Sequence, residues 1–237
     1  MNNCVSKEQH SFLSIKNVSN VYITEHMGIF GQIKKKQILN HVNLELQAGE
    51  IFGLTGKSGC GKTTLARCIL DLIDYEGEIL LDGNKYNKKS AQIQMVFQQP
   101  GASLNPTKKI GYLLEEPLII HKYEKLNRSQ KADEMLIRAG LDPSYKSRYA
   151  HELSGGQKQR VCIARALILE PRLLIADEAI SSLDVSAGAQ ILNLFRELHK
   201  NLGLSILFIS HNSNAVEYLC SRVAVLERGK DLRILGS

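Results

Sequence analysis

The segment Gly56–Thr64 combines three glycines with lysine and hydroxyl side chains in the order Gly-Lys-Ser-Gly-Cys-Gly-Lys-Thr-Thr. Glycine permits tight backbone turns, so consecutive N–H groups of such a loop can point toward one anion. Lys62 adds a cation and Thr63 a hydroxyl that can ligate a metal. The spacing predicts a loop that binds the β- and γ-phosphates of a nucleotide together with Mg²⁺. Its predicted nucleotide-binding residues are Gly56, Lys57, Ser58, Gly59, Cys60, Gly61, Lys62, Thr63 and Thr64.

Two adjacent carboxylates follow the apolar run at 173–176. Parallel strands of an open α/β sheet bind ligands at their carboxyl ends, which is where this run would deliver Asp177 and Glu178. We expect Asp177 to position the metal and Glu178 to act as the general base that activates water for attack on the γ-phosphate. Two surface acids at a strand end are the alternative, and the phosphate loop upstream disfavours it.

Apolar residues on both sides of the loop predict the elements that hold it. Residues 51–54 form a short apolar run, typical of a buried strand, that ends just before the loop. After the loop, apolar side chains recur at helical spacing, at Leu65, Ile69, Leu72 and Ile73. A helix that begins here aims the partial positive charge of its N-terminus at the phosphates.

Most of the remaining chain alternates strands with helices. Strands are predicted at 12–15, 18–23, 42–46, 78–81, 93–97, 173–176 and 204–209, with a loop at 27–37. Between the last two strands, Ile191, Leu194, Phe195 and Leu198 form one helix face, which favours a right-handed parallel crossover. A hairpin of 223–226 with 233–235 closes an α/β sandwich core.

Residues 98–153 have a different character. Pro100, Gly101, Asn105 and Pro106 predict an irregular loop, and helical stretches follow around 110–118 and 129–139. This region is the candidate for an inserted helical subdomain. The Leu-Ser-Gly-Gly-Gln segment at 153–157 then precedes an amphipathic helix, whose N-terminus would form a second anion site.

Composition narrows the class of protein. Of the 237 residues, 43% are hydrophobic and 23% charged, as in ordinary globular proteins, and no run approaches the length of a membrane span. The formal net charge is +6, but the lysine clusters lie beside no base-reading motif, so we expect no nucleic-acid partner. Five scattered cysteines without a C-x-x-C pair favour reduced thiols. The N-terminus lacks an apolar signal core, which predicts a cytosolic chain unless a partner holds it elsewhere.

Six motifs together resemble the ATP-binding subunits of ABC transporters, from about Phe12 to about Lys230. They are the phosphate loop, Gln98, the 153–157 segment, the acid pair, the run 181–184 and His211. The resemblance implies an α/β fold: a P-loop NTPase core (a RecA-like parallel sheet with helices), an N-terminal antiparallel β region and an inserted α-helical subdomain. It implies a single domain, 1–237, in which 12–97 and 160–237 form the nucleotide-binding core with the β subdomain. Residues 98–159 would form the helical and signature subdomain.

The resemblance also implies a nucleotide site shared by two subunits. Each ATP would lie between the phosphate loop of one subunit and the 153–157 segment of the other, in a head-to-tail dimer. Ser182 and Asp184 would communicate across that dimer. The residues implied to bind nucleotide from the second subunit are Ser154, Gly155, Gly156 and Gln157.

Catalytic and metal-binding roles are implied in the same way. Gln98 would reach the metal and the attacking water, and His211 would contact the γ-phosphate and hold the arrangement of water and Glu178. The implied catalytic residues are therefore Glu178, His211 and Gln98, and the implied metal ligands are Thr63, Gln98 and Asp177. The implied cofactors are ATP and Mg²⁺.

Some positions depart from the family pattern or leave alternatives open. Tyr22 and Phe30 are candidates to stack on the base, and ordinary packing explains either ring equally well. Lys36 or its neighbours occupy places where relatives often have the stacking aromatic residue. Lys57 adds a second cation to the loop, and Asn212 follows His211 where Asp is usual.

The run 98–106 resembles the peptide and nickel importer branch of the family, and Ala179 after the acid pair is more similar to its nickel importers. We therefore expect an ATPase that powers uptake of nickel, or of a metal chelate, and place oligopeptide or dipeptide import second. A non-transport ABC ATPase of DNA repair or translation is a third possibility, which the lack of a long coiled coil and of a second such domain disfavours.

The implied partners are a second, homologous ATPase subunit in a heterodimer, or a second copy in a homodimer. Two transmembrane permease subunits and, indirectly, an extracytoplasmic solute-binding protein would complete the importer. The chain would then lie peripherally on the cytoplasmic face of the cell (inner) membrane.

Overall fold

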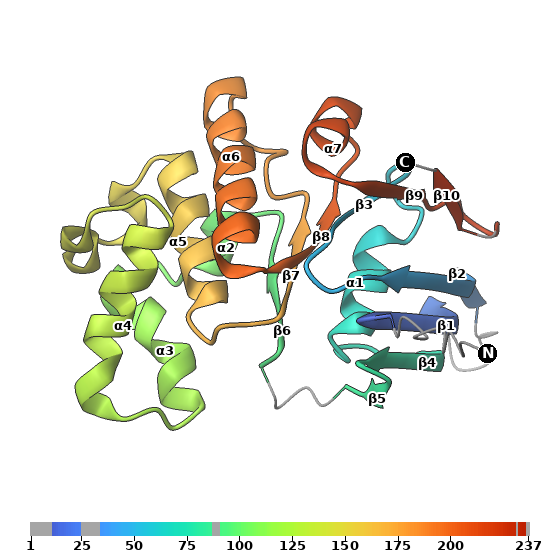
Figure 1. Ribbon diagram of the computed structural model, residues 1–237, viewed down its shortest axis with the longest axis horizontal. Helices are drawn as coiled ribbons and strands as arrows, with labels where there is room; N and C mark the ends of the chain where they lie inside the picture. Colours follow the sequence, from blue (N-terminus) through green and yellow to red (C-terminus); the bar gives the residue numbers. More distant parts are fainter. Residues whose placement is uncertain (1–10, 25–33, 87–90, 231, 236–237) are drawn as a thin grey trace, which may run out of the picture.

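The computed structural model contains two β-sheets with a helix between them, and it describes residues 11–24, 34–86, 91–230 and 232–235. The smaller sheet is antiparallel, with the strand order β2-β1-β4-β5 (Figure 1). Its strands are β1 (Leu13–Thr24), β2 (Lys34–Leu46), β4 (Glu76–Leu81) and β5 (Asn84–Lys85). The N-terminal antiparallel β region expected from the sequence is therefore present.

The larger sheet has the order β10-β9-β3-β8-β7-β6, in which all neighbours run parallel except the pair β9–β10. Its strands are β3 (Ile51–Thr55), β6 (Ile93–Val96), β7 (Leu173–Asp177), β8 (Ser205–Ile209), β9 (Arg222–Val225) and β10 (Arg233–Leu235). The predicted parallel crossover and closing hairpin are confirmed. The sheet brings the carboxyl ends of β3, β6, β7 and β8 to one edge.

Strand β7 shows why the sequence of this sheet is continuously apolar. Leu173 and Ile175 pack into the core next to the antiparallel sheet, while Leu174 and Ala176 pack into the core beneath the helices on the other face. Every residue of the strand is buried. A strand covered on both faces has no solvent side, so the usual polar alternation is lost.

Helices cover both faces of the large sheet. Helix α1 (Lys62–Ile69) lies between the two sheets, and α6 (Val185–Leu202) and α7 (Ser213–Leu219) lie on the opposite face (Figure 1). In the part of the chain that the structure describes, no helix has the length and apolar character needed to cross a bilayer.

The region between β6 and β7 is helical, as predicted. It contains α2 (Pro100–Ser103), α3 (Ile110–Ile120), α4 (Lys125–Arg138), the short 3₁₀ helices η2 (Pro143–Ser147) and η3 (Ala150–Glu152), and α5 (Gly155–Leu167). Helix α5 runs through the subdomain boundary expected at 159/160, so one helix joins the 153–157 segment to the core. The division into two subdomains at these positions stays a prediction.

Three local expectations are wrong. Strand β2 already begins at Lys34, inside the loop predicted at 27–37, because its first residues pair with β1. The strands predicted at 12–15 and 18–23 form one strand, whose pairing with β2 is interrupted by register shifts. Helix α1 ends at Ile69, since Asp71 adopts a left-handed conformation with φ 54°, and Leu72 lies outside the helix.

Candidate nucleotide site

The phosphate loop leaves β3 in a conformation that requires glycine at two positions. Gly56 has φ 150°, and a Cβ there would lie 2.2 Å from the carbonyl oxygen of Leu226. Gly61 has φ 116°, and a Cβ there would lie 2.8 Å from Cδ2 of Leu39. The loop is thus held between the end of β9 and strand β2, where a side chain would displace backbone or core atoms.

Helix α1 begins at Lys62 directly after this loop. Its N-cap is Gly61, which makes no side-chain capping bond, so the N–H groups of the first turn remain available to an anion. Lys62 is only 7% exposed, and its ammonium donates hydrogen bonds to the carbonyl oxygens of Gly56 (2.8 Å) and Lys57 (3.3 Å). Loop and helix therefore present one cation and several N–H groups at the same place.

Thr63 and Asp177 meet across the edge of the sheet. The Thr63 hydroxyl donates a 2.8 Å hydrogen bond to Oδ2 of Asp177. The other carboxylate oxygen, Oδ1, is buried and has no hydrogen-bond partner within the described ranges. Burial raises the pKa of the Asp177 carboxyl, and the bond from Thr63 opposes that effect. A buried, unpaired carboxylate oxygen beside a hydroxyl fits Mg²⁺, which prefers oxygen ligands and commonly uses one carboxylate together with substrate phosphates.

Glu178 and His211 form the second polar pair of the site. Nδ1 of His211 lies 2.9 Å from Oε1 and 2.8 Å from Oε2 of Glu178. The Glu178 side chain is 10% exposed, whereas that of His211 is 64% exposed. Glu178 adopts a left-handed φ of 50°, which its N–H bond to the carbonyl oxygen of Ile209 helps to hold. Such a carboxylate can accept a proton from a water molecule, and the imidazole fixes its direction.

These groups line one cavity of about 560 Å³ at the carboxyl edge of the large sheet. The predicted residues in its wall are Ser58, Gly59, Gly61, Lys62, Thr63, Thr64, Gln98, Glu178 and His211. Asp177 joins them through Thr63. Gly56, Lys57 and Cys60 instead line a neighbouring cavity, which shares Ser58, Gly59 and His211 with the first. The side chain of Cys60 is buried there.

The antiparallel sheet completes the cavity wall with Tyr22, Lys36 and Ile38. Tyr22 pairs directly with Lys36 across β1 and β2, and directly paired residues of an antiparallel sheet point to the same face. The sequence draws attention to Tyr22 and Lys36 in connection with base stacking, but it does not single out Ile38. Its only sequence signal is its place near the start of an apolar strand, and the pairing of β2 decides that it reaches the site. Phe30, the other aromatic candidate, lies outside the described residues.

The structure does not bring the 153–157 segment to this cavity. Ser154 caps helix α5 in a reciprocal arrangement with Gln157: the Gln157 N–H donates to the Ser154 hydroxyl (3.3 Å), and the Ser154 N–H donates to Oε1 of Gln157 (3.0 Å). Gly155 is exposed. The segment is therefore a second open helix N-terminus, facing solvent in the single chain.

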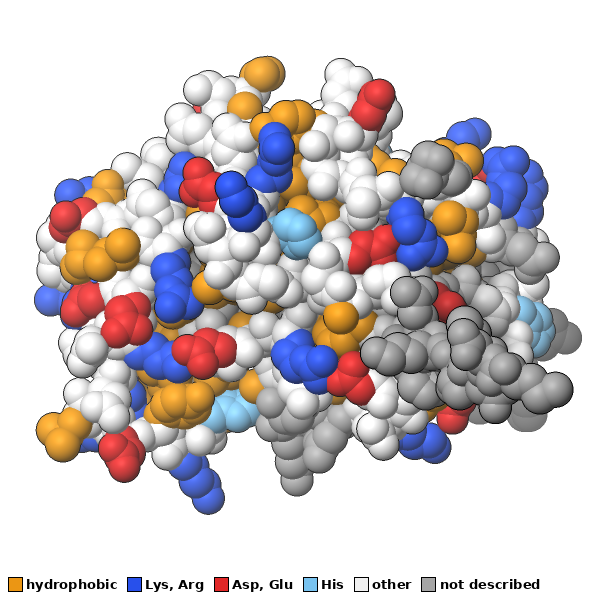
Figure 2. All heavy atoms as spheres, viewed as in Figure 1, with side chains coloured by type: hydrophobic (Ala, Val, Ile, Leu, Met, Phe, Trp, Pro, Cys, Tyr) orange, Lys and Arg blue, Asp and Glu red, His pale blue; other side chains and the backbone are white. Residues whose placement is uncertain are grey.

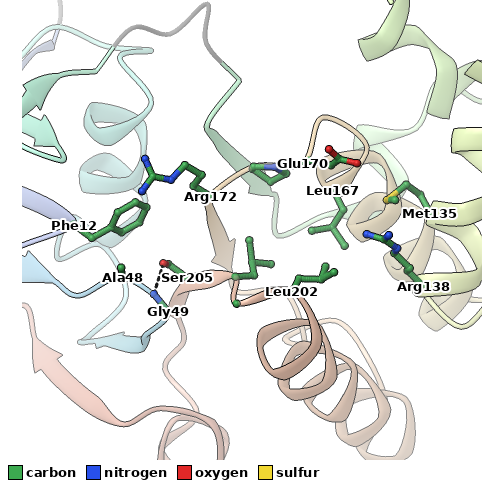
Figure 3. Close-up of a pocket in the computed structure, with 13 residues that line it drawn as sticks. Phe12, Ala48, Gly49, Met135, Arg138, Leu167, Glu170, Arg172, Leu202 and Ser205 are labelled. Atoms are coloured by element: carbon green, nitrogen blue, oxygen red, sulfur yellow. Dashed lines mark hydrogen bonds between the residues drawn. The ribbon is translucent and has the colours of Figure 1, made fainter. Parts of the chain in front are cut away.

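Another cavity, of about 420 Å³, lies at the opposite edge of the large sheet (Figure 3). Phe12 and Gly49 line it from one side and Met135 and Arg138 from the helices on the other. The guanidinium of Arg172 lies over the Phe12 ring and is paired with Asp82. This cavity is at the amino ends of β7 and β8, away from the loop and the acid pair, so it is not the nucleotide site.

Comparisons with known proteins agree with this geometry. A family model described as "ABC transporter" matches residues 39–181. The oligopeptide transport ATP-binding protein AppF of Bacillus subtilis is 41% identical over 240 residues, which cover 96% of this chain and 73% of that protein. OppF of Haemophilus influenzae, also named an oligopeptide transport ATP-binding protein, is 42% identical over 88% of this chain and 70% of its own length.

A similar solved structure is the ATP-binding cassette MJ0796, a dimer in a post-hydrolysis state bound to ADP and Pi. It superposes with a TM-score of 0.80 at 31% identity, covering 94% of this chain and 98% of that one. The predicted P-loop NTPase fold is thereby confirmed. The chain belongs to the ABC transporter family and is an ATPase of that family.

Proposed function

We propose that this chain hydrolyses ATP to power the import of peptides across a membrane. The observation that carries the proposal is one cavity lined by loop residues, by Thr63 with its bond to Asp177, and by the Glu178–His211 pair. An in-line attack of water on a γ-phosphate needs these three parts close together: a phosphate cradle, a metal position and a base.

In the proposed complex the triphosphate lies in the loop against the N-terminus of α1. The ammonium of Lys62, now bonded to two loop carbonyls, exchanges them for β- and γ-phosphate oxygens. Tyr22 lies half-buried in the same cavity wall and offers its ring to the adenine, with Lys36 beside it. Because its side chain lines the cavity, we assign the stacking role to Tyr22.

The metal position is built by Thr63 and Asp177, with Gln98 in the same cavity wall. The unpaired Oδ1 of Asp177 is the oxygen that gains most from a cation, because a buried carboxylate without a partner is costly. When bound, Mg²⁺ would offset the negative charge of the β- and γ-phosphates. Thr63, Asp177 and Gln98 are the residues that would hold it.

Glu178 is the proposed general base. Its carboxylate accepts a proton from the water whose oxygen attacks the γ-phosphorus, and the bond from that phosphorus to the bridging oxygen of ADP breaks. His211 keeps the carboxylate oriented through the two short contacts of its Nδ1 and turns its exposed side toward the γ-phosphate. Gln98, in the same cavity wall, would orient the attacking water.

Replacing Glu178 with Gln tests this assignment. The Glu178→Gln variant should bind Mg-ATP with affinity near that of the wild type but hydrolyse it about 10²- to 10⁴-fold more slowly, because the amide cannot accept the proton. Phosphate release and equilibrium ATP binding measure the two effects. Glu217→Gln on the exposed side of α7 is the matched control and should hydrolyse normally. Hydrolysis at the wild-type rate in Glu178→Gln would remove Glu178 from its role.

The proposed active form is a pair of ATPase subunits that share each nucleotide. The exposed N-terminus of α5 lies outside the cavity of its own chain, so a second subunit must supply this anion site. The partner is proposed to be a homologous ATPase subunit or a second copy. The dimeric structure of MJ0796 supports this arrangement by analogy.

A permease surface is proposed on the helical region. Hydrophobic side chains gather over α3 and α4, at the lower left of Figure 2. Ile120 is 70% and Leu126 92% exposed there. Exposed apolar side chains that gather on one region suit contact with a partner protein. We therefore propose two permease subunits and, through them, a solute-binding protein, with the ATPase held at the cytoplasmic face of the membrane.

Peptides are the proposed solute because the relatives AppF and OppF are named for oligopeptide transport. The sequence alone favours nickel because of Ala179, and the named relatives favour the reverse order. Cells that express the complete importer should accumulate labelled oligopeptides, and those with the Glu178→Gln subunit should not. Accumulation of labelled Ni²⁺ without peptide would restore the nickel assignment.

A further inference from the structure

Gln159 carries a buried amide that finds no hydrogen-bond partner within the described part of the chain. Its side chain on α5 has 0% of its surface exposed, and neither its Nε2 nor its Oε1 has a hydrogen-bond partner among the residues that the structure describes. Buried polar groups in folded proteins are nearly always paired, so two unpaired atoms on one side chain need an explanation. The amide plays no part in the site described above.

The neighbours of α5 show where this amide points. A Cβ at Gly156 would lie 3.3 Å from the Ala187 side chain, so that face of α5 contacts α6. The Cys162 thiol contacts the carbonyl oxygen of Pro100 at 3.8 Å, so another face contacts α2. At about 100° per residue, Gln159 projects about 60° from each of these two directions, into the wedge between them.

Two segments that carry site residues border this wedge. Strand β6 contacts α5 and continues through Phe97 into Gln98. On the other side, the chain after Glu178 lies against the N-termini of α5 and α6: Leu183 approaches Gly155, and Ile180 approaches Gly188. A side chain in the wedge is therefore placed between the Gln98 segment and the Glu178 segment.

We propose that Gln159 is a positioning residue, whose amide pairs with the backbone of the segments 97–99 and 179–183 only when Mg-ATP is bound. Resting on the function proposed above, the inference is that Mg-ATP engages Gln98 and Glu178 and draws both segments toward the amide. Left unpaired, the amide destabilises the nucleotide-free arrangement; once paired, it stabilises the arrangement with Mg-ATP bound. Both site residues are held in register by one side chain.

Gln159→Met tests the proposal, because methionine has similar length and no group that needs a hydrogen bond. Thermal unfolding without nucleotide should occur at the same temperature as in the wild type or higher, since an unpaired amide is removed. In the Glu178→Gln background, which retains ATP, the added Gln159→Met change should weaken Mg-ATP binding about tenfold and reduce the ATP-induced rise in Tm. With Glu178 intact, kcat should fall about tenfold.

Gln130→Met, at an exposed position of α4, is the matched control and should leave ATP binding and kcat unchanged. A Tm several degrees lower in nucleotide-free Gln159→Met would overturn the proposal, because the amide would then be paired in the resting state, for example by a buried water. The proposal would also be overturned if Gln159→Met left ATP affinity within twofold of that of Glu178→Gln and kcat within twofold of that of the wild type. Failure of the proposed catalytic role appears separately, as hydrolysis by Glu178→Gln alone.

Discussion

Gly155 and Gly56 show that the fold constrains the glycines of the two proposed nucleotide-binding segments to different degrees. Gly155 is the first residue of α5, it is exposed, and a Cβ there would lie 3.5 Å from Cδ2 of Leu183, an ordinary contact. Gly56 in the phosphate loop differs, because a Cβ there would collide with a backbone carbonyl. The fold therefore requires glycine at Gly56 and tolerates other residues at Gly155.

Gly155→Asp should separate ATP binding from hydrolysis. A carboxylate in the first helical turn favours the helix, so stability should be unchanged or slightly higher. The same charge would repel the phosphates of the nucleotide held by the partner subunit, so hydrolysis by the assembled pair should fall more than tenfold while the isolated chain still binds ATP. The neutral Gly155→Asn should retain more activity. Full hydrolysis by Gly155→Asp would contradict the shared site.

At the scale of elements, helix ends hold the functional segments. Helix α6 begins after Asp184, whose carboxylate accepts a 2.8 Å hydrogen bond from the Ala187 N–H. Helix α7 begins in the same way after Asn212, whose side-chain oxygen accepts from the Ala215 N–H at 3.1 Å. Asn caps helices about as well as Asp, which explains how Asn212 can follow His211 without loss of the helix.

Asp184→Ala should destabilise the protein by about 1 kcal/mol, because the first turn of α6 loses its cap. Asp184→Asn should keep most of that stability. Urea unfolding of both variants measures the difference. A loss of hydrolysis in Asp184→Asn at unchanged stability would support the expected role of the carboxylate across the dimer. Equal stability of Asp184→Ala and the wild type would contradict the capping role.

At the scale of the whole molecule, burial in the two hydrophobic cores raises the pKa of cysteine thiols. Cys60, Cys68, Cys162 and Cys220 are free thiols. Burial raises the pKa of Cys68, Cys162 and Cys220 from 9.0 to about 12 in each case. The folded protein therefore keeps these thiols protonated in a range where the unfolded chain would ionise them.

The stability of the protein should consequently fall as the pH rises from about 9 toward 12. Below pH 9 the folded and unfolded states both hold the thiol protons, so the contribution of the thiols to stability is complete. Above pH 9 the unfolded state releases protons that the folded state retains. Between pH 8 and pH 10, each of these thiols should lower the free energy of unfolding by about 1 kcal/mol. Urea unfolding at pH 8 and pH 10 measures the loss, and a variant with Ala at Cys68, Cys162 and Cys220 should lose less. Equal pH dependence in both proteins would contradict the assignment.

The sequence by itself determined the parts of the site whose chemistry is local. The phosphate loop can be predicted from consecutive residues. Its tight turns need glycine, and the helix that follows needs only apolar residues at helical spacing. The acid pair can be predicted in the same way, because it directly follows an apolar run of strand length. The sequence therefore predicts Asp177 and Glu178 at the carboxyl end of β7, where they lie. It also predicts the helical character of the region between β6 and β7.

Only the tertiary structure decided what depends on strand pairing and on packing between distant elements. The pairing of β1 with β2 brings Tyr22, Lys36 and Ile38 to the cavity. Parallel pairing of β7 with β8 brings the segment after Ile209 beside Glu178, so that His211 can contact it. The unpaired amide of Gln159 follows from the packing of α5. Such contacts join residues far apart in the chain, and no local pattern of residue types encodes them.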